Sequence, residues 1–347
     1  MPQPQDHRDR ARLIPPSLAD PSPPEVTERS AAVPPAADET DRFLLTQLLE
    51  QGRSTNRDLA QAAGISESAV SIRLKKLMSA GSLVFTALVD WEVAGFEWFA
   101  IARIRTGNRT PREVASSIAE LDECEAVAVV VGACDVLAYF LLRDRAEVHR
   151  LIAERLSAID GISDLALDLA TESFVTPLGR QFFIARNVPA IRLPAPRIEI
   201  DDLDVALMQS LITDGRQSSR AIARLHDVAE GTVRSRLSRL DKAGLCRVTA
   251  MVEPLSLGYA GVIAHVTLTV RRNAYVAVRQ ALDSLPGLVF VASTSGQAGL
   301  SISLAAPSQQ HVLDLVATQL RAIDGVDRAE TLIMVDVVRF SPYLKRL

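Results

Sequence analysis

Cysteine and histidine are scarce in this chain. Its 347 residues include three Cys and five His. Cys124, Cys134 and Cys246 do not follow the close spacing of a metal site, and none has a histidine at ligand spacing beside it. We therefore expect reduced thiols in the core of a cytoplasmic protein, with no bound metal and no cofactor.

Long apolar runs and an excess of positive charge are also absent. The longest apolar stretch, 126–142, is interrupted by Gly132 and Asp135 and alternates with the period of a strand. It therefore predicts two paired strands rather than a membrane span. No apolar run follows a basic start, which argues against a secretory signal. The net charge of −4 and the pI of about 5.8 exclude coating of nucleic acid by bulk charge, so such a contact needs local basic faces.

Proline is distributed unevenly along the chain. Nine of the 18 prolines lie within residues 1–38, where large apolar residues are few, and this composition predicts a disordered tail. A second proline-rich stretch, 177–199, predicts a semi-extended linker. Elsewhere, 48% hydrophobic and 23% charged residues over the whole chain fit soluble globular domains.

Residues 56–81 have the pattern of two short helices joined by a tight turn. Gly64 can adopt the positive φ of the turn, Ser66 can cap the second helix, and Gly81 can end it. Apolar residues repeat with helical spacing at Leu59, Ala60, Ala63, Val70, Leu74 and Leu77. With a preceding helix over 41–50, the pattern predicts a helix-turn-helix (HTH) module. A three-helix module used only for packing fits one copy equally well.

The same plan recurs 163 residues later. This shift takes Asp41 to Asp204, Ala60 to Ala223, Val70 to Val233, Arg73 to Arg236, Leu77 to Leu240 and Gly81 to Gly244. After one inserted residue the agreement continues from Gly132 to Gly296 and from Gly161 to Gly325. An ungapped match over about forty positions indicates an internal duplication, so the chain holds two copies of one two-part unit.

The second part of each unit alternates strands and helices. In the first unit we expect strands at 83–90, 96–105, 126–131, 136–142 and 162–174, and helices at 111–121 and 146–159. The second unit repeats this order at 261–270, 274–285, 289–294, 300–304, 308–323 and 326–338. Such an order predicts an antiparallel sheet with both helices on one face. The open apolar face must be covered by the other half or by another chain.

Each half of the chain resembles a full-length member of the Lrp/AsnC, or feast/famine, family, over 39–175 and 200–340. The resemblance implies an α+β fold of two repeats, each a winged-type three-helix HTH domain followed by a ferredoxin-like βαββαβ (RAM/AsnC-type) domain. The expected divisions are a tail (1–38), HTH domain 1 (39–82), sensor and dimerisation domain 1 (83–176), a linker (177–199), HTH domain 2 (200–245) and sensor and dimerisation domain 2 (246–341).

The family implies a transcriptional regulator that binds double-stranded DNA. In an HTH, the start of the second helix approaches base edges while basic side chains contact phosphates. The residues expected at DNA are Ser66, Ser68, Ala69, Ser71, Ile72, Arg73, Lys75, Lys76, Thr232, Arg234, Ser235, Arg236 and Arg239. Ala229 replaces the capping serine in the second copy and Gly231 follows it, so the two copies are expected to read different half-sites. One chain would then act as a pseudo-dimer on an asymmetric site.

A glycine-containing turn between the two central strands is the expected effector site. The family places a G-x-x-D turn where dimers meet and where an amino acid binds, which implicates Gly132, Ala133 and Asp135 here. An aspartate that only satisfies its own turn is the alternative. The second copy has Gly296 and Gly299, with glycine in place of the acid, which puts an amino-acid site there in doubt.

Two other functions share this architecture. Siroheme decarboxylases bind a tetrapyrrole in the sheet domain, but 94–100, where their His- and Arg-rich motif is expected, contains no histidine. His265, on a strand, is the one candidate, and a satisfied core histidine is the simpler interpretation. The third possibility is an adaptor that oligomerises through its sheet domains and no longer binds DNA. The regulator is favoured because both helical modules keep polar or basic outer faces, and we expect it to form homo-oligomers away from any membrane.

Overall fold

The computed structural model describes residues 37–52, 54–80, 83–89, 96, 98–176, 178–179, 198–252, 260–296 and 299–340. The expected tail up to residue 36, most of the linker, and the helix-ending Gly81 lie outside the described residues. Within the described part, the structure contains no helix long and apolar enough to cross a membrane. The same residues include no group of three or more His, Cys, Asp or Glu placed to hold a metal ion.

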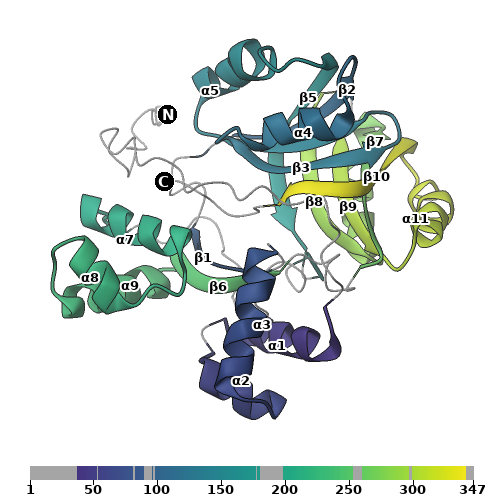
Figure 1. Cartoon of the computed structure of the whole chain (residues 1–347). Helices are drawn as coiled ribbons and strands as arrows, with labels where there is room; N and C mark the ends of the chain where they lie inside the picture. Colours follow the sequence, from purple (N-terminus) through teal and green to yellow (C-terminus); the bar gives the residue numbers. More distant parts are fainter. Residues whose placement is uncertain are drawn as a thin grey trace, which may run out of the picture.

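Two three-helix modules occupy the positions predicted for the HTH domains (Figure 1). The first contains α1 (Glu39–Glu50), α2 (Asn56–Ala63) and α3 (Glu67–Ser79), and the second contains α7 (Asp202–Thr213), α8 (Ser219–Leu225) and α9 (Glu230–Lys242). Ser66 caps α3 by accepting a hydrogen bond from the Ala69 amide, as predicted. Ala229 gives α9 no side-chain cap.

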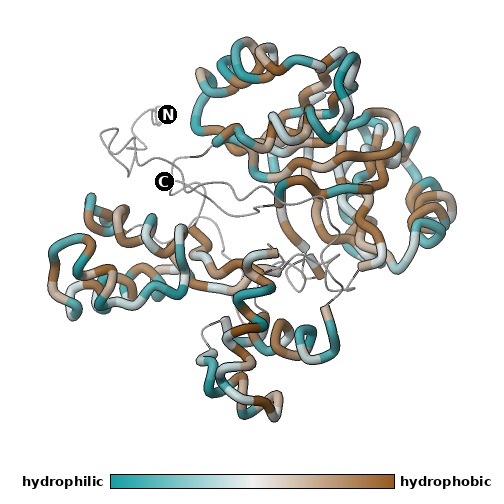
Figure 2. The backbone as a smooth tube through the Cα atoms, viewed as in Figure 1, coloured by the Kyte–Doolittle hydropathy of each residue, from teal (hydrophilic) through white to brown (hydrophobic). Residues whose placement is uncertain are grey.

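Each sheet domain has the predicted βαββαβ order. The first contains β2 (Trp98–Thr106), α4 (Pro111–Ala119), β3 (Cys124–Val131), β4 (Val136–Leu142), α5 (Arg145–Arg150) and β5 (Ile162–Val175). The second contains β7 (Val262–Val270), α10 (Tyr275–Ala281), β8 (Leu288–Ser295), β9 (Leu300–Ala306), α11 (Gln309–Leu315) and β10 (Val326–Phe340). Figure 2 shows that the hydrophobic residues concentrate in these strands.

The expected helices differ from the observed ones in detail. The helix expected over 146–159 is α5 followed by a π-helical turn, Leu151–Leu156, and α11 is likewise followed by Val316–Leu320. The helix expected over 274–285 is α10 flanked by short 3₁₀ turns, Arg272–Ala274 and Leu282–Ser284. The α-helix cannot run on to 285 because Leu285 precedes Pro286 and is extended, with φ −72° and ψ 122°.

The two sheets close into one eight-stranded barrel of order β10-β3-β4-β2-β5-β8-β9-β7. Two antiparallel seams join the halves, one between β10 and β3 and one between β5 and β8. The interior includes a cluster of buried apolar residues from both halves: Ile101, Ala128, Val130, Cys134, Leu137, Ala292 and Leu332. The predicted cover for the open sheet face is therefore the other half of the same chain. The three cysteines are free and buried, as expected.

The duplication is visible in where the elements begin. The starts of α1 and α7, α2 and α8, and α3 and α9 all differ by 163 residues, whereas those of β3 and β8, β4 and β9, and β5 and β10 differ by 164. The helical parts of the two units therefore correspond without a gap. The starts of β2 and β7 also differ by 164, so the single residue that the sequence indicated is inserted before the barrel begins.

A two-stranded ribbon lies between the helical modules (Figure 1). Strand β1 (Leu83–Val89) of the first unit pairs antiparallel with β6 (Cys246–Val252) of the second. Thr86 is opposite Thr249, and these residues are themselves 163 apart, so the approximate twofold relation of the units passes through this pair. The sequence predicted a connecting strand but not that the two strands would pair with each other.

Candidate nucleic-acid interface and effector turns

Each helical module packs on the ribbon strand of the other unit. The core of the first module includes Ala250 of β6, and the core of the second includes Ala87 and Val89 of β1. A Cβ at Gly52 would lie 2.9 Å from the Ala250 amide nitrogen, and one at Gly215 would lie 2.7 Å from that of Thr86. This crossed packing fixes both modules to one ribbon.

An ion-pair cluster ties the third helix of each module to the first. Arg73 lies 2.6 Å from the Asp38 carboxylate and 2.8 Å from that of Asp41. These two carboxylates raise the pKa of Arg73, Asp38 more than Asp41, and the Arg73 guanidinium lowers the pKa of Asp38. In this geometry the Arg73 guanidinium holds α3 against α1, so its predicted contact with DNA would have to be made by a cation already paired twice.

The second module repeats the cluster. Arg236 lies 2.6 Å from Asp201 and 3.0 Å from Asp204, and these carboxylates raise its pKa, Asp201 more than Asp204. Arg239, also expected at DNA, forms an ion pair with Asp204 and donates to the Glu199 carbonyl at 2.8 Å. Asp204 is almost fully buried. Two of the expected contact arginines of α9 therefore share one buried carboxylate.

In the first module, the remaining residues expected at DNA lie on or beside one outer face of α3. Ser66, Ser68, Ile72, Lys75 and Lys76 are exposed, and Ala69 and Ser71 are half-buried. Ile72 is 69% exposed, which is unusual for a large aliphatic side chain and leaves a methyl surface for contact. The opposite face, with Val70, Leu74 and Leu77, is buried in the module.

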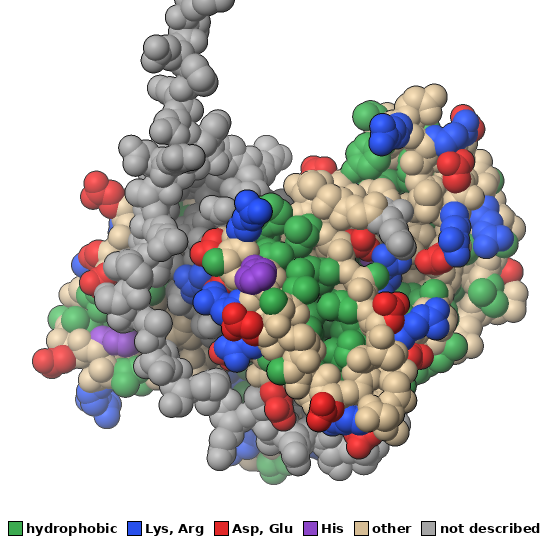
Figure 3. Space-filling view, turned by 90° about the horizontal axis from the view of Figure 1, so that it is seen from above, with side chains coloured by type: hydrophobic (Ala, Val, Ile, Leu, Met, Phe, Trp, Pro, Cys, Tyr) green, Lys and Arg blue, Asp and Glu red, His purple; other side chains and the backbone are tan. Residues whose placement is uncertain are grey.

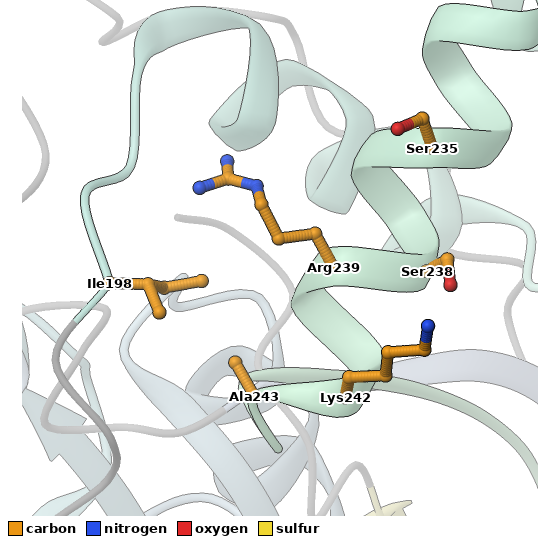
Figure 4. A pocket seen from close by; sticks show the side chains of 6 residues that line it. All are labelled: Ile198, Ser235, Ser238, Arg239, Lys242 and Ala243. Atoms are coloured by element: carbon orange, nitrogen blue, oxygen red, sulfur yellow. The ribbon is translucent and has the colours of Figure 1, made fainter.

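The corresponding face of α9 has different chemistry. Arg234 and Ser235 are exposed and Thr232 is half-buried; the Arg234 guanidinium is 3.6 Å from Glu230 one turn away. An open groove of about 580 Å³ runs along this helix beside the segment before α7. Figure 4 shows its lining side chains: Ile198, Ser235, Ser238, Arg239, Lys242 and Ala243. Hydroxyl, ammonium and guanidinium groups of this kind are donors for phosphate oxygens.

The first predicted effector turn lies at a seam of the barrel. Gly132, with φ 150°, is so close to β10 of the second unit that a Cβ would lie 2.6 Å from the Thr331 carbonyl oxygen. Ala133 beside it is exposed. The Asp135 carboxylate accepts hydrogen bonds from Thr106, at 2.8 Å from its amide and 3.4 Å from its hydroxyl. The aspartate therefore braces the turn, and its other oxygen has capacity for a further donor.

At the second turn the carboxylate belongs to the facing strand and not to the turn itself. Gly296 has φ 152°, and a Cβ there would lie 2.1 Å from Oδ1 of Asp168 on β5 of the first unit. Asp168 is 2% exposed and lies 2.9 Å from Arg103. Gly299 is half-buried where the first turn has Asp135. The carboxylate at this seam thus comes from the facing strand and is already paired.

Sequence reasoning missed the polar contact between the halves inside the barrel. His265 is fully buried, and its Nδ1 lies 3.0 Å from the Tyr139 hydroxyl of the other half. Burial, assisted by the positive charge of Arg103, lowers the pKa of His265 to about 3. Strand alternation places His265 on one face of β7 but carries no information about a partner 126 residues away. The histidine is a core residue, as expected, but it is not fully satisfied, because its buried Nε2 has no hydrogen-bond partner.

Comparison with known proteins identifies the two domain types. A family model for winged helix-turn-helix DNA-binding domains matches residues 38–81, and one for the Lrp/AsnC ligand binding domain matches twice, over 99–176 and 262–344. An uncharacterised HTH-type transcriptional regulator of Pyrococcus furiosus is 30% identical over 135 residues, which make up 39% of this chain and 91% of that protein. The chain belongs to the Lrp/AsnC family. A similar regulator of Pyrococcus abyssi is 32% identical, over 39% of this chain and 85% of its own length.

This Lrp/AsnC chain is thus more than twice as long as the segment that matches a nearly complete relative. Among solved structures, the siroheme decarboxylase NirDL matches with a TM-score of 0.56 and 14% identity, over 88% of this chain and 94% of that one. At this identity the match shows a common fold alone. It extends over most of the chain, and so over both units.

Proposed function

We propose that this Lrp/AsnC chain is a sequence-specific DNA-binding transcriptional regulator that presents two different recognition helices as a single-chain pseudo-dimer. The observation that supports this most directly is the pair of outer faces on α3 and α9, held in one chain by the β1–β6 ribbon. The equivalent positions differ: Ser68 faces out where α9 has Gly231, and Ile72 where α9 has Ser235. Two unlike faces suit an asymmetric operator.

The distribution of charge is consistent with contact through these modules. On the face seen from above in Figure 3, basic and acidic side chains are interspersed. By contrast, Lys75 and Lys76 are exposed on α3, and Ser238 and Lys242 line the groove along α9. Phosphate neutralisation by a few such side chains supplies affinity, and base-edge contacts supply specificity.

A DNA-binding assay tests this proposal. The purified protein should prefer DNA from its own upstream region to a random duplex by about a hundredfold, at both about 50 and 200 mM salt. Lys76→Ala and Arg234→Ala should each lower the salt slope by about 1. Arg155→Ala, an exposed change in the sheet domain, should leave binding unchanged. Equal binding of both duplexes, or equal affinity for an operator and for palindromes of each half-site, contradicts the proposal.

The regulator is further proposed to respond to an amino acid or similar small molecule at the Gly132–Asp135 turn. The free capacity of the Asp135 carboxylate would accept hydrogen bonds from an ammonium group. Titration of individual amino acids into the DNA assay should shift affinity for at least one of them, and Asp135→Asn should remove the shift. Asp164→Asn, at an exposed carboxylate of β5, is the matched control. We also propose that chains assemble further in the cytoplasm; because the inner faces of both sheets are closed against each other in one barrel, such contacts would use the outer surface of the sheet domains.

Because the chain shares its fold with the siroheme decarboxylase NirDL, decarboxylation of a tetrapyrrole is the alternative function to test. We propose that this chain does not act on tetrapyrroles, since His265, the one histidine among the described residues that is fully buried, is bonded to Tyr139 inside the barrel. Incubation with siroheme tests this: unchanged absorbance and no decarboxylated product are expected. A bound tetrapyrrole band with product formation would favour the enzyme instead.

A further inference from the structure

Arg216 joins the two HTH modules directly. It lies in the turn between α7 and α8 of the second module, and its guanidinium reaches the start of α2 in the first. Nη1 donates to the Asn56 side-chain oxygen at 3.2 Å, and Nη2 donates to the Ser54 carbonyl at 3.1 Å. These contacts cross from one unit to the other over 160 and 162 residues of sequence.

The same guanidinium covers an aromatic ring of the ribbon. Its central carbon lies 4.0 Å from the ring centroid of Phe85 on β1, and Phe85 is 3% exposed. Stacking on one face leaves the edge of the planar group free for its two hydrogen bonds, a combination that lysine cannot reproduce. Arg216 therefore contacts the first module and the ribbon at once.

The backbone that carries Arg216 is itself fixed on β1. The Gly215 amide donates to the Phe85 carbonyl at 2.9 Å, and the close approach to Thr86 leaves no room for a Cβ at Gly215. On the other side of the twofold relation, the position of Phe85 is taken by Val248. Valine has no ring on which a guanidinium can stack, so the stacked contact has no counterpart at that position.

We propose that Arg216 is a positioning residue that sets the distance and angle between the recognition helices α3 and α9, and hence the half-site spacing that the chain accepts on DNA. A two-stranded ribbon is strongly twisted and, without a third strand, only marginally stable by itself, so bending of the ribbon would change the angle between the modules that pack on it. The contacts of Arg216, which connect the second module to the ribbon and to the first module, restrict movement of the two modules relative to each other. This inference rests on the proposed DNA-binding function, but its structural part can be measured without DNA.

The first experiment uses probes on the recognition helices. Ser79 and Lys242 are equivalent exposed positions at the ends of α3 and α9, and the three native cysteines are buried. Spin labels at Ser79→Cys and Lys242→Cys should give one narrow distance distribution in the full chain. Arg216→Ala and Arg216→Lys should each broaden it at least twofold, whereas the exposed control Arg220→Ala should not. An unchanged distribution in Arg216→Ala overturns the proposal.

The second experiment uses DNA with the two half-sites moved apart or together in single base-pair steps. The unsubstituted chain should prefer one spacing at least tenfold, and Arg216→Ala should lose most of this preference while binding an isolated half-site as before. A uniform loss at every spacing and at the half-site would show a direct DNA contact or a folding defect, and would overturn the positioning role. If the unsubstituted chain binds no DNA specifically, the proposed function fails, while the distance measurement still decides the role of Arg216.

Discussion

Arg73 on the recognition helix forms an ion pair with Asp41 of α1, whose carboxylate is 2.8 Å away and whose side chain is 7% exposed. Replacing Arg73 by alanine would leave that carboxylate nearly buried and without its cation. We expect Arg73→Ala to lower the free energy of unfolding by about 1–3 kcal/mol and to weaken DNA binding by loosening α3. Urea unfolding, combined with a double-mutant cycle with Asp41→Asn, measures the pair.

Lys76→Ala is the control for this prediction because Lys76 is exposed on the same helix. It should reduce the salt dependence of DNA binding while changing stability by no more than about 0.5 kcal/mol. If Arg73→Ala instead left stability unchanged and reduced the salt dependence of DNA binding, Arg73 would contact a DNA phosphate, as the sequence predicted.

The buried His265 predicts a specific pH dependence of stability. Its pKa falls from 6.5 to about 3 on folding, so the native protein keeps it neutral where the unfolded chain binds a proton. The contribution of His265 to stability is therefore complete above pH 6.5 and declines as the pH falls toward 3, by about 1.4 kcal/mol per unit. Urea unfolding at pH 7 and 5.5 should show a loss of about 1 kcal/mol from this residue.

His265→Gln should remove this part of the pH dependence, whatever it does to stability at pH 7. His311→Gln provides the comparison, since His311 is exposed on α11 and bonded only locally to Ser308. If His265→Gln and the unsubstituted protein lose the same stability between these pH values, the histidine is not held neutral in the barrel.

Local patterns predicted most elements of this fold, but not the π-helical and 3₁₀ turns beside its barrel helices. Ser66 caps α3, Gly64 turns the chain with φ 66°, and the apolar alternation of 126–142 gives β3 and β4. Each of these features depends on residues within a few positions of one another. The repeat at 163 residues then predicted a second copy of the helical module and of the six elements of the sheet domain, and the family model matches both sheet domains.

Contacts between the copies could not be predicted in this way. The pairing of Thr86 with Thr249, the stacking of Arg216 on Phe85, and the bond of Tyr139 to His265 each join distant residues. A strand pattern states which face is apolar but not which strand will lie beside it. For the same reason the sequence identified Arg73 as basic and accessible to DNA, without showing the two carboxylates that hold it.

Two glycines of the second module should respond to alanine with opposite signs. In Gly215→Ala the new methyl group would lie 2.7 Å from the Thr86 amide nitrogen, and backbone cannot move aside cheaply. We expect a loss of about 1–3 kcal/mol. Gly231, in the first turn of α9, has no atom within 4 Å of a new Cβ, so Gly231→Ala should gain up to about 1 kcal/mol. Thermal unfolding compares the two, and equal effects would contradict the crossed packing.

Asp227 is the one described non-glycine residue with positive φ, at 52°, and it occupies the turn position that Gly64 holds in the first module with φ 66°. A left-handed conformation costs an ordinary L-residue about 1–2 kcal/mol, less for aspartate, whereas glycine adopts it freely at the cost of more entropy in the unfolded chain. Asp227→Gly should therefore raise the free energy of unfolding by about 0.5 kcal/mol, measured in urea.

The converse change, Gly64→Ala, tests the same physics in the first module. A Cβ at Gly64 would meet no atom within 4 Å, so any loss of stability comes from the backbone conformation and not from a clash. We expect Gly64→Ala to cost about 1 kcal/mol and Asp227→Asn to be nearly neutral, because asparagine tolerates the left-handed region. If Asp227→Gly proved clearly destabilising, a contact of the Asp227 side chain would stabilise this turn. Backbone conformation alone would then not explain the stability of the turn in both modules.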